Sequence, residues 1–258
     1  MWDKIISQDR AKKILTNIFK TGNIAHAYIF YGKDGTGKDA AALEFAKLLN
    51  CENPVDNNAC DVCKNCTRIS TFKSPIVRFI TALPAGKDSD DNDTLSDLKP
   101  EDYELLNEEL VKKSEDIYHK IRLPKANTIR ISSIRDIKNS IYLSENSNVK
   151  KVYIISDADL MNVYTSNSLL KILEEPPKNS VIILTTSRIN SLLPTIVGRC
   201  QKIRFDDIPL EELKKYIKSK KPDFTENEIN LIAELSNGSI YTCLLYTSPS
   251  PRDRTRSR

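Results

Sequence analysis

Residues 27–39 read Ala-Tyr-Ile-Phe-Tyr-Gly-Lys-Asp-Gly-Thr-Gly-Lys-Asp, the most informative segment of the chain for its architecture. Its first five residues predict a buried strand and a helical pattern begins at Lys38, so the glycines lie in a strand-to-helix turn. This is the context of a phosphate-binding loop, in which backbone N–H groups and the positive end of the helix face phosphate oxygens. The candidate nucleotide-binding residues of the loop are Gly32, Gly35, Thr36, Gly37, Lys38 and Asp39.

The loop departs from the usual pattern at its last position. The spacing matches Gly-x4-Gly-Lys, but Asp39 stands where a Ser or Thr hydroxyl would bind Mg²⁺. A carboxylate can bind Mg²⁺, yet it also brings a like charge close to a polyanion, which costs roughly 4 kcal/mol at about 4 Å and an effective dielectric constant of about 20. Two interpretations stay open: a site for ATP and Mg²⁺, or a turn that keeps the fold without binding nucleotide tightly.

A second departure follows a later strand. An Asp that binds Mg²⁺ should be followed there by a Glu that activates water, but the chain has Asp157 and then Ala158. Asp159 lies one residue too far along to replace that base without a backbone shift. A positioned general base contributes ~10²–10⁴ in rate. We therefore expect the chain to be a poor ATPase by itself.

Strand and helix patterns alternate along the body of the chain, which predicts an α/β fold with a parallel sheet covered by helices. The predicted strands are residues 27–31, 77–80, 151–155, 181–185 and 201–204. The predicted helices are residues 8–20, 38–49, 100–118, one capped by Ser132 or Ser133 and running to 143, one ending at 173–175, 210–219 and 226–235. Because only helical patterns follow residue 206, we expect a large domain over 1–205 and a small helical domain over 206–242.

Four cysteines form the pattern C-x8-C-x2-C-x2-C within sixteen residues, which predicts an inserted metal module over residues 51–66: Cys51, Cys60, Cys63 and Cys66. Tetrahedral Zn²⁺ takes four thiolates, and four protein ligands leave no open position, so the predicted site is structural. A disulfide framework does not suit a cytosolic chain with a phosphate-binding loop. An iron–sulfur cluster also accepts four cysteines and remains an alternative.

Composition and charge place the chain among globular proteins. Apolar residues make up 40% and charged residues 29%, which excludes a disordered or fibrous chain. No apolar run is long enough to span a bilayer and the N-terminus has no secretory signal, so we expect a cytoplasmic protein without a membrane partner. The net charge is +4, but residues 84–120 hold five Lys and twelve acidic residues, a local charge of −7. We assign no role to this acidic insertion, taken as residues 84–128.

The last residues differ from the rest in composition. From Tyr246 onward the chain is rich in Ser, Pro and Arg and low in complexity. The segment from about Cys243 resembles translated adapter sequence, and the alternative is a native basic arm. We expect residues 243–258 to be a non-native tail that truncates the helical domain.

Several isolated charged residues have simple interpretations. A single Arg such as Arg199 is most often a surface salt bridge, and Lys171 with Glu174 fits an i,i+3 ion pair. His26 is most simply a packed residue and His119 a solvated one.

These motifs together resemble the clamp-loader branch of the AAA+ ATPases, over roughly residues 4–83 and 129–240. Within it the nearest match is the delta-prime type of subunit of bacterial DNA polymerase III, with the gamma/tau type as its relative. The four-Cys module directly after the loop helix is one specific feature of the resemblance. The other stretches that carry it are Ile5-Ile-Ser-Gln8, His26-Ala-Tyr-Ile-Phe-Tyr-Gly32, Ser166-Asn-Ser-Leu-Leu-Lys-Ile-Leu-Glu-Glu-Pro-Pro177 and Leu193-Pro-Thr-Ile-Val-Gly-Arg-Cys200.

The resemblance gives Arg199 a different role. The family has Ser-Arg-Cys here, and its Arg reaches across a subunit boundary onto the ATP of the neighbouring subunit; in this chain Gly198 replaces the Ser. The resemblance also implies that Asp157 matches the Mg²⁺-binding Asp and that Thr185 or Thr186 takes the sensor position, of which we select Thr186.

Other matches and departures narrow the type of subunit. Ala158 departs from the motor subunits and favours the delta-prime type. Asn237-Gly-Ser239 matches the start of the last helix of a lid domain, but no Arg follows it before residue 243, and we expect the family's helical collar domain to be absent.

The resemblance implies a zinc-binding, stator-like subunit that supplies Arg199 in trans to a gamma/tau ATPase. Gamma/tau and delta subunits would be its partners, with the sliding clamp and primed DNA reached through the assembled complex. A gamma/tau-type motor that hydrolyses ATP with Lys38, Asp39 and Asp157 is one alternative. A zinc-bearing interaction module without a part in ATP chemistry is another.

Overall fold

A computed structural model describes residues 2–85, 95, 97–141 and 149–247. Within these residues, five parallel strands form one sheet in the order β2-β3-β4-β1-β5. The strands are β1 (Ala27–Tyr31), β2 (Val77–Ile80), β3 (Lys151–Ile155), β4 (Ser180–Thr186) and β5 (Gln201–Arg204). All five predicted strands and the α/β fold class are confirmed, with β4 one residue longer at each end than predicted.

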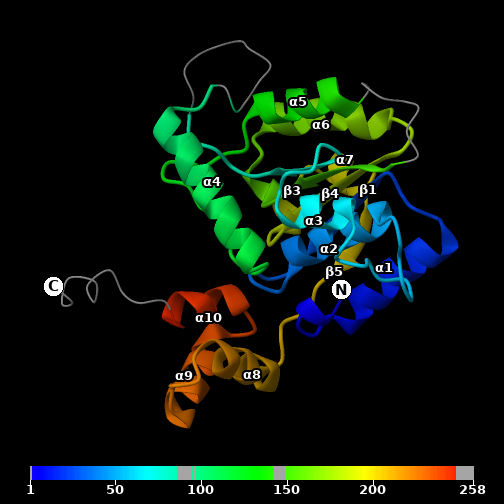
Figure 1. Cartoon of the computed structure of the whole chain (residues 1–258). Coiled ribbons are helices and arrows are strands. Elements are labelled where there is room, and N and C mark those ends of the chain that lie inside the picture. The colour runs from blue at the N-terminus through cyan, green and yellow to red at the C-terminus, as the bar shows by residue number, and fades with distance from the viewer. Residues whose placement is uncertain (1, 86–94, 96, 142–148, 248–258) are drawn as a thin grey trace.

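Helices cover both faces of the sheet (Figure 1). Helices α1 (Asp9–Thr21), α2 (Lys38–Asn50) and α3 (Lys64–Ser70) lie on one side, where the apolar face of α1 and the buried residues of α2 pack on alternate strand residues. Helices α5 (Ile131–Ile141), α6 (Val163–Glu174) and α7 (Pro194–Val197) cover the other face. Short 3-10 helices occur at Trp2–Lys4, Ala158–Leu160 and Ile189–Ser191.

Because the strands are parallel, their carboxyl ends meet at one edge of the sheet. Tyr31 at the end of β1 pairs with Thr186 of β4, and Ile155 at the end of β3 pairs with Leu184. The residues after β1 and β3 therefore lie beside the end of β4, at the sheet edge where open α/β folds bind ligands.

The acidic insertion contributes a long helix, α4 (Pro100–Glu115), which begins with Pro at its first position. It ends three residues earlier than predicted, because the chain turns at Asp116, whose carboxylate accepts a hydrogen bond from the Tyr118 amide. The predicted cap of α5 was also wrong, since this helix already begins at Ile131 and both Ser132 and Ser133 lie inside its first turn.

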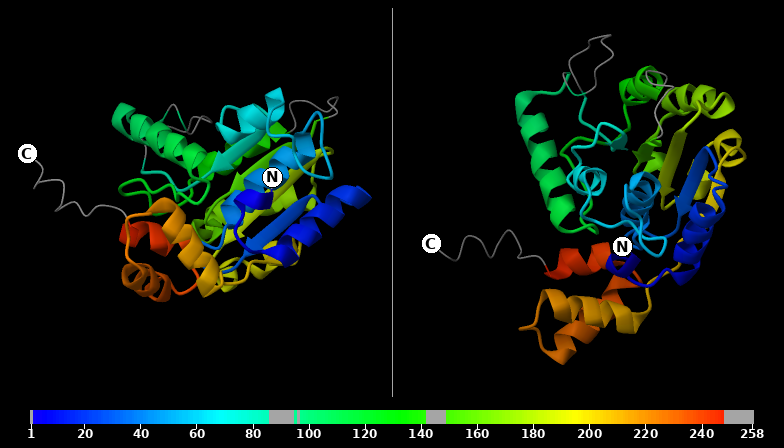
Figure 2. Two further views of the ribbon diagram at one scale, coloured as in Figure 1. Left: turned by 60° about the horizontal axis from the view of Figure 1, so that its bottom comes forward. Right: turned by 45° about the vertical axis from the view of Figure 1, so that its right-hand side comes forward.

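Three helices follow the sheet in the part of the chain described up to residue 247: α8 (Leu210–Lys220), α9 (Glu226–Ser236) and α10 (Ile240–Thr247). They share a small core and lie together at one end of the molecule, next to the C-terminal end of α4 (Figures 1 and 2). Helix α10 continues past residue 242, and Cys243 is buried in it. The remainder of the predicted tail, residues 248–258, lies outside the described residues.

No helix within the described ranges combines the length and the apolar character that crossing a membrane requires.

Candidate nucleotide site and cysteine cluster

The phosphate-binding loop connects β1 to α2 and is closed by contacts within the chain. The Lys38 ammonium turns back into the loop and donates to the carbonyl oxygens of Gly32 at 2.8 Å and Lys33 at 2.6 Å. The Thr36 hydroxyl likewise donates to the Lys33 carbonyl at 2.8 Å. Burial lowers the pKa of Lys38, with nearby carboxylates opposing the shift. The lysine that should reach the terminal phosphates is therefore engaged by the loop itself.

Two glycines of the loop face neighbouring segments directly. Gly35 has φ +73°, and a Cβ there would lie 2.3 Å from the Ser239 hydroxyl. The Gly35 carbonyl accepts a hydrogen bond from the Ile240 amide at 3.1 Å. Gly37 has φ +91° and would place a Cβ 3.2 Å from the Tyr118 ring. The start of α10 and the residues after α4 thus press on the loop, at positions where only glycine fits easily.

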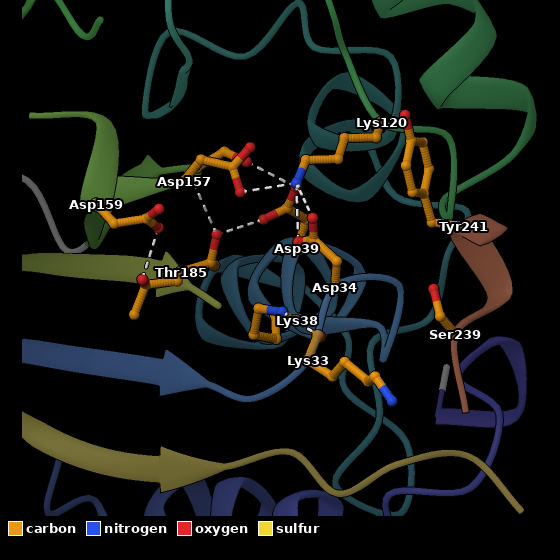
Figure 3. A network of polar contacts seen from close by, with 12 residues as sticks. Lys33, Asp34, Lys38, Asp39, Lys120, Asp157, Asp159, Thr185, Ser239 and Tyr241 are labelled. Carbon is orange, nitrogen blue, oxygen red and sulfur yellow. Dashed lines mark hydrogen bonds and ion pairs between the residues drawn. The ribbon is translucent and has the colours of Figure 1, made fainter. Parts of the chain in front are cut away.

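Asp39 is held by hydroxyls and by a buried lysine. Its carboxylate accepts a hydrogen bond from Thr185 at 2.6 Å (Figure 3) and another from Ser156 at 2.8 Å. The Lys113 ammonium of α4 lies 3.6 Å from the same carboxylate, and its side chain is only 1% exposed. Burial alone would raise the pKa of Asp39, but Lys113 and the two hydroxyls lower it below its ordinary value. Asp39 is therefore an ionised partner of Lys113 rather than an open Mg²⁺ ligand.

A second lysine of the insertion joins the two other carboxylates at the loop. The Lys120 ammonium lies 2.8 Å from Asp34 and 2.9 Å from Asp157, with its side chain 12% exposed (Figure 3). Burial lowers the pKa of Lys120, but the attraction of the two carboxylates outweighs it and raises the pKa above its usual value. Asp157, the predicted Mg²⁺ ligand, is thus bound to a cation of its own chain.

These contacts leave little space and no unbalanced positive charge among the described side chains of the loop cavity. Three carboxylates face three ammonium groups: Asp34, Asp39 and Asp157 against Lys38, Lys113 and Lys120. The remaining cavity has a volume of about 40 Å³. Pockets that hold a drug-sized ligand have about 300–1,000 Å³. The cavity is therefore much smaller than a pocket that holds a drug-sized ligand.

Lys113 and Lys120 were not among the residues predicted for the site, and the insertion that contains them had no predicted role. The buried residues of α4 are Leu106, Glu109 and Lys113, whose spacing of three and four places them on one helix face. That spacing was the available signal for Lys113. Lys120 lies beyond the helix end, and no periodic pattern could have located it.

The two threonines at the end of β4 point to different partners. Thr185 contacts Asp39, whereas the Thr186 hydroxyl donates to Asp159 at 2.6 Å. Arg188 also pairs with Asp159, at 2.7 Å. Of the two sensor candidates, Thr185 lies at the loop, and Thr186, which we selected, belongs to a neighbouring ion-pair cluster.

The four predicted metal-binding cysteines come together after α2. Their sulfur atoms all lie within 4.8 Å of one another, and all six cysteines of the chain are free thiols. Backbone amides of the cluster donate to sulfur, from Cys60 to Cys51 at 3.2 Å and from Cys63 to Cys60 at 3.3 Å. Such bonds, from the amides of Val62 and Cys63, lower the pKa of Cys60 to about 7. A set of four sulfur atoms fits a tetrahedral metal ion such as Zn²⁺.

Arg199 lies apart from the loop cavity and is not among the described residues that line it. Its guanidinium pairs with Glu174 at 3.0 Å and donates to the Thr195 carbonyl at 3.0 Å, with 38% of the side chain exposed. The expected Lys171–Glu174 pair is therefore replaced by a contact between Glu174 and Arg199. The interpretation of His119 as solvated was wrong, because its ring lies 2.7 Å from Glu109 and is about three-quarters buried.

The chain is similar in sequence to known proteins. The family described as "DNA polymerase III, delta subunit" matches residues 7–209. The delta' subunit of DNA polymerase III from Bacillus subtilis is 31% identical over 232 residues, which cover 89% of this chain and 56% of that protein. The tau subunit from the same organism is 26% identical over 247 residues, 94% of this chain and 36% of its own length. The chain thus spans about a third to just over half the length of these relatives.

Two solved structures share the fold. A gamma subunit-related protein of DNA polymerase III from Thermotoga maritima has a TM-score of 0.52 at 20% identity, with 92% of this chain and 57% of that chain covered. The RuvB Holliday junction branch migration motor of Thermotoga maritima has a TM-score of 0.53 at 14% identity, with 94% and 61% covered. These likenesses support an α/β fold of the AAA+ type.

Proposed function

The chain belongs to the DNA polymerase III delta-subunit family, and we propose that it is a clamp-loader subunit of the delta-prime type that does not hydrolyse ATP. Gamma/tau and delta subunits are its partners in this proposal, and the assembled complex places a sliding clamp on primed DNA. The relatives named as tau and delta' subunits of DNA polymerase III support the assignment of this chain to such a complex.

The filled loop is the observation that carries the non-hydrolysing role. A triphosphate entering the cavity would have to displace Lys113 from Asp39 and Lys120 from Asp34 and Asp157. It would then meet three carboxylates in a space that now measures about 40 Å³. Ala158 also supplies no general base next to Asp157. The chain therefore lacks both the room for ATP and the group that would activate water.

Arg199 is the residue that acts on a partner. Its guanidinium does not line the chain's own cavity, is 38% exposed and is held by Glu174 and the Thr195 carbonyl. An arginine supplied in trans is worth ~10³–10⁵ in the rate of related phosphoryl-transfer reactions. In the proposed ring, Arg199 completes the ATP site of the adjacent gamma/tau subunit.

The cysteine cluster and the last helices have structural roles in this proposal. Residues 51–66 form a module stabilised by one Zn²⁺ on Cys51, Cys60, Cys63 and Cys66, in support of which the four sulfur atoms lie within 4.8 Å of one another. Residues 1–205 form the AAA+ domain, and residues 206–242 belong to a helical lid domain that contains α8, α9 and the first residues of α10.

The test is a clamp loader reconstituted from gamma/tau, delta and this chain, with sliding clamp and primed DNA. Arg199→Ala should abolish the share of DNA-stimulated ATP hydrolysis that comes from the neighbouring site, since the trans arginine is worth ~10³-fold or more there. Lys202→Ala, at an exposed position of β5, is the matched control and should leave turnover unchanged. Unaltered ATP hydrolysis and loading with Arg199→Ala would contradict the trans role and favour a zinc-bearing interaction module.

The gamma/tau relatives support one other candidate, an ATP-hydrolysing motor. That function requires the two insertion lysines to leave the loop when ATP binds. ATP turnover by the isolated chain, lost in Lys38→Ala, would favour the motor over the delta-prime type.

A further inference from the structure

Residues 116–122, which we name the clasp, lie between the phosphate-binding loop and the C-terminal helices. On the helical side, the Asp116 carboxylate lies 3.0 Å from the Lys220 ammonium and accepts a hydrogen bond from Tyr216 at 3.2 Å. The Tyr118 ring packs against the Tyr216 ring at a centroid distance of 6.0 Å. Both partners belong to α8, so the clasp contacts this helix at two points.

The same residues contact the sheet domain on their other side. The Tyr118 hydroxyl accepts a hydrogen bond from the Ile6 amide at 2.7 Å, and the ring lies against Gly37 of the loop. Tyr118 is 7% exposed and belongs to the core shared by α8–α10. Lys120 adds the ion pairs with Asp34 and Asp157. One short segment thus has buried contacts with both parts of the chain.

Tyr241 of α10 completes this arrangement (Figure 3). The Lys120 ammonium lies 5.8 Å from the centre of the Tyr241 ring, and the Arg122 guanidinium lies 5.5 Å from it. Arg122 also donates to the Tyr241 hydroxyl at 3.1 Å. Cation–π contacts at such distances are attractive, and more so when the cation is partly buried. Lys120 therefore joins the loop carboxylates to α10 through a single side chain.

We propose that the clasp takes the place of a bound nucleotide and holds α8–α10 against the phosphate-binding loop without ATP. A ligand in this cavity would have to contact the loop on one side and α10 on the other, and Lys120 makes both contacts already. The insertion that the sequence left without a role thus fixes the position of the C-terminal helices. The clasp presupposes the proposed function only in that no nucleotide fills the loop.

Direct contacts also connect the two parts, so the test must isolate the clasp. The Lys33 ammonium donates to the Asn237 carbonyl at 2.6 Å, and the Ile240 amide donates to Gly35. Neither contact involves residues 116–122. Variants within the clasp leave both in place, and any loosening they cause is due to the clasp.

The experiment is hydrogen–deuterium exchange of the full chain without nucleotide. Lys120→Gln removes the cation at nearly constant length and should raise exchange in α8–α10 by about tenfold, as expected for the loss of a partly buried ion pair and a cation–π contact. Arg122→Ala removes only the contacts of a 59% exposed side chain and should raise exchange about threefold. Lys215→Ala, which breaks an exposed i,i+3 pair within α8, is the matched control and should change nothing beyond its own turn.

The outcomes of these experiments distinguish a failure of the clasp from a failure of the trans role of Arg199. If Lys120→Gln fails to fold because Asp157 loses its cation and Asp34 keeps only Arg122 at 3.9 Å, Arg122→Ala decides, since it leaves both carboxylates paired with Lys120. Unchanged exchange in α8–α10 of the folded variants would overturn the clasp. If the clasp variants loosen α8–α10 but the reconstituted loader does not depend on Arg199, the clasp stands and the trans role fails.

Discussion

The ion pair between buried Lys113 and Asp39, whose side chain is 18% exposed, permits a quantitative prediction. Lys113 is 1% exposed, lies 3.6 Å from the Asp39 carboxylate and donates to the His119 carbonyl at 2.7 Å. In Lys113→Met the carboxylate keeps only the Thr185 and Ser156 hydroxyls. A buried charge that loses its counterion costs about 3–5 kcal/mol, so we expect the free energy of unfolding to fall by about 3 kcal/mol or more.

The reciprocal change leaves the lysine unpaired. Asp39→Asn should be destabilising for the same reason, because it removes the carboxylate that forms an ion pair with the Lys113 ammonium at 3.6 Å. Lys113→Met with Asp39→Asn removes both charges, so its cost should be smaller than the sum of the single changes by about 2 kcal/mol. Lys112→Met, one residue earlier on a 52% exposed side chain, is the control and should cost about 1 kcal/mol or less.

The assay is urea unfolding at pH 7, followed both by the fluorescence of Trp2 and by far-ultraviolet circular dichroism. Coincident transitions from the two probes allow free energies to be compared between variants. In thermal unfolding, 3 kcal/mol corresponds to about 6–12 °C for a chain of this size. Single-variant costs that add within about 0.5 kcal/mol would refute the pairing of Lys113 with Asp39.

Three further predictions concern other parts of the chain. Burial raises the pKa of Tyr118 to about 12. The neutral phenol therefore contributes its full stability below about pH 10, and this contribution is lost as the pH rises toward 12. Between these pH values the free energy of unfolding should fall by up to about 3 kcal/mol more in wild type than in Tyr118→Phe. Gly35→Ala would place its Cβ 2.3 Å from the Ser239 hydroxyl and should lower the melting temperature well below that of Gly22→Ala, which has a similar φ but open space around it; equal losses would show that the loop does not press on α10. Cys63→Ser should abolish a zinc content of about one per chain in mass spectrometry, as expected for a site that needs four thiolates, whereas Cys200→Ser should retain it.

The sheet could be predicted from the sequence because its strands are nearly continuous apolar runs. In β3 and β4 almost every residue is buried, since helices cover both faces, and such runs are distinct from the periodic pattern of the surrounding helices. The meeting of the loop with Asp157 followed from the parallel order of the strands. The bounds of α4 were less predictable, because a side chain of the turn, Asp116, ends the helix rather than a Gly or Pro.

The occupation of the loop could not be derived from local patterns. Lys113 and Lys120 are separated from Asp39 by more than 70 residues and lie in a strongly acidic segment. The sequence shows that Asp39 is unusual but not which cation compensates it, because that depends on how α4 packs against the sheet. The same holds for His119, whose partner Glu109 lies on the preceding helix.

Isothermal titration calorimetry of the isolated chain with Mg²⁺-ATP tests whether the phosphate-binding loop is closed to nucleotide. If its own lysines occupy the phosphate-binding loop, no saturable binding should be seen at ligand concentrations below about 1 mM, the point at which the binding free energy is about −4 kcal/mol. A dissociation constant in the micromolar range, lost in Lys38→Ala, would contradict the claim and require the insertion to vacate the loop.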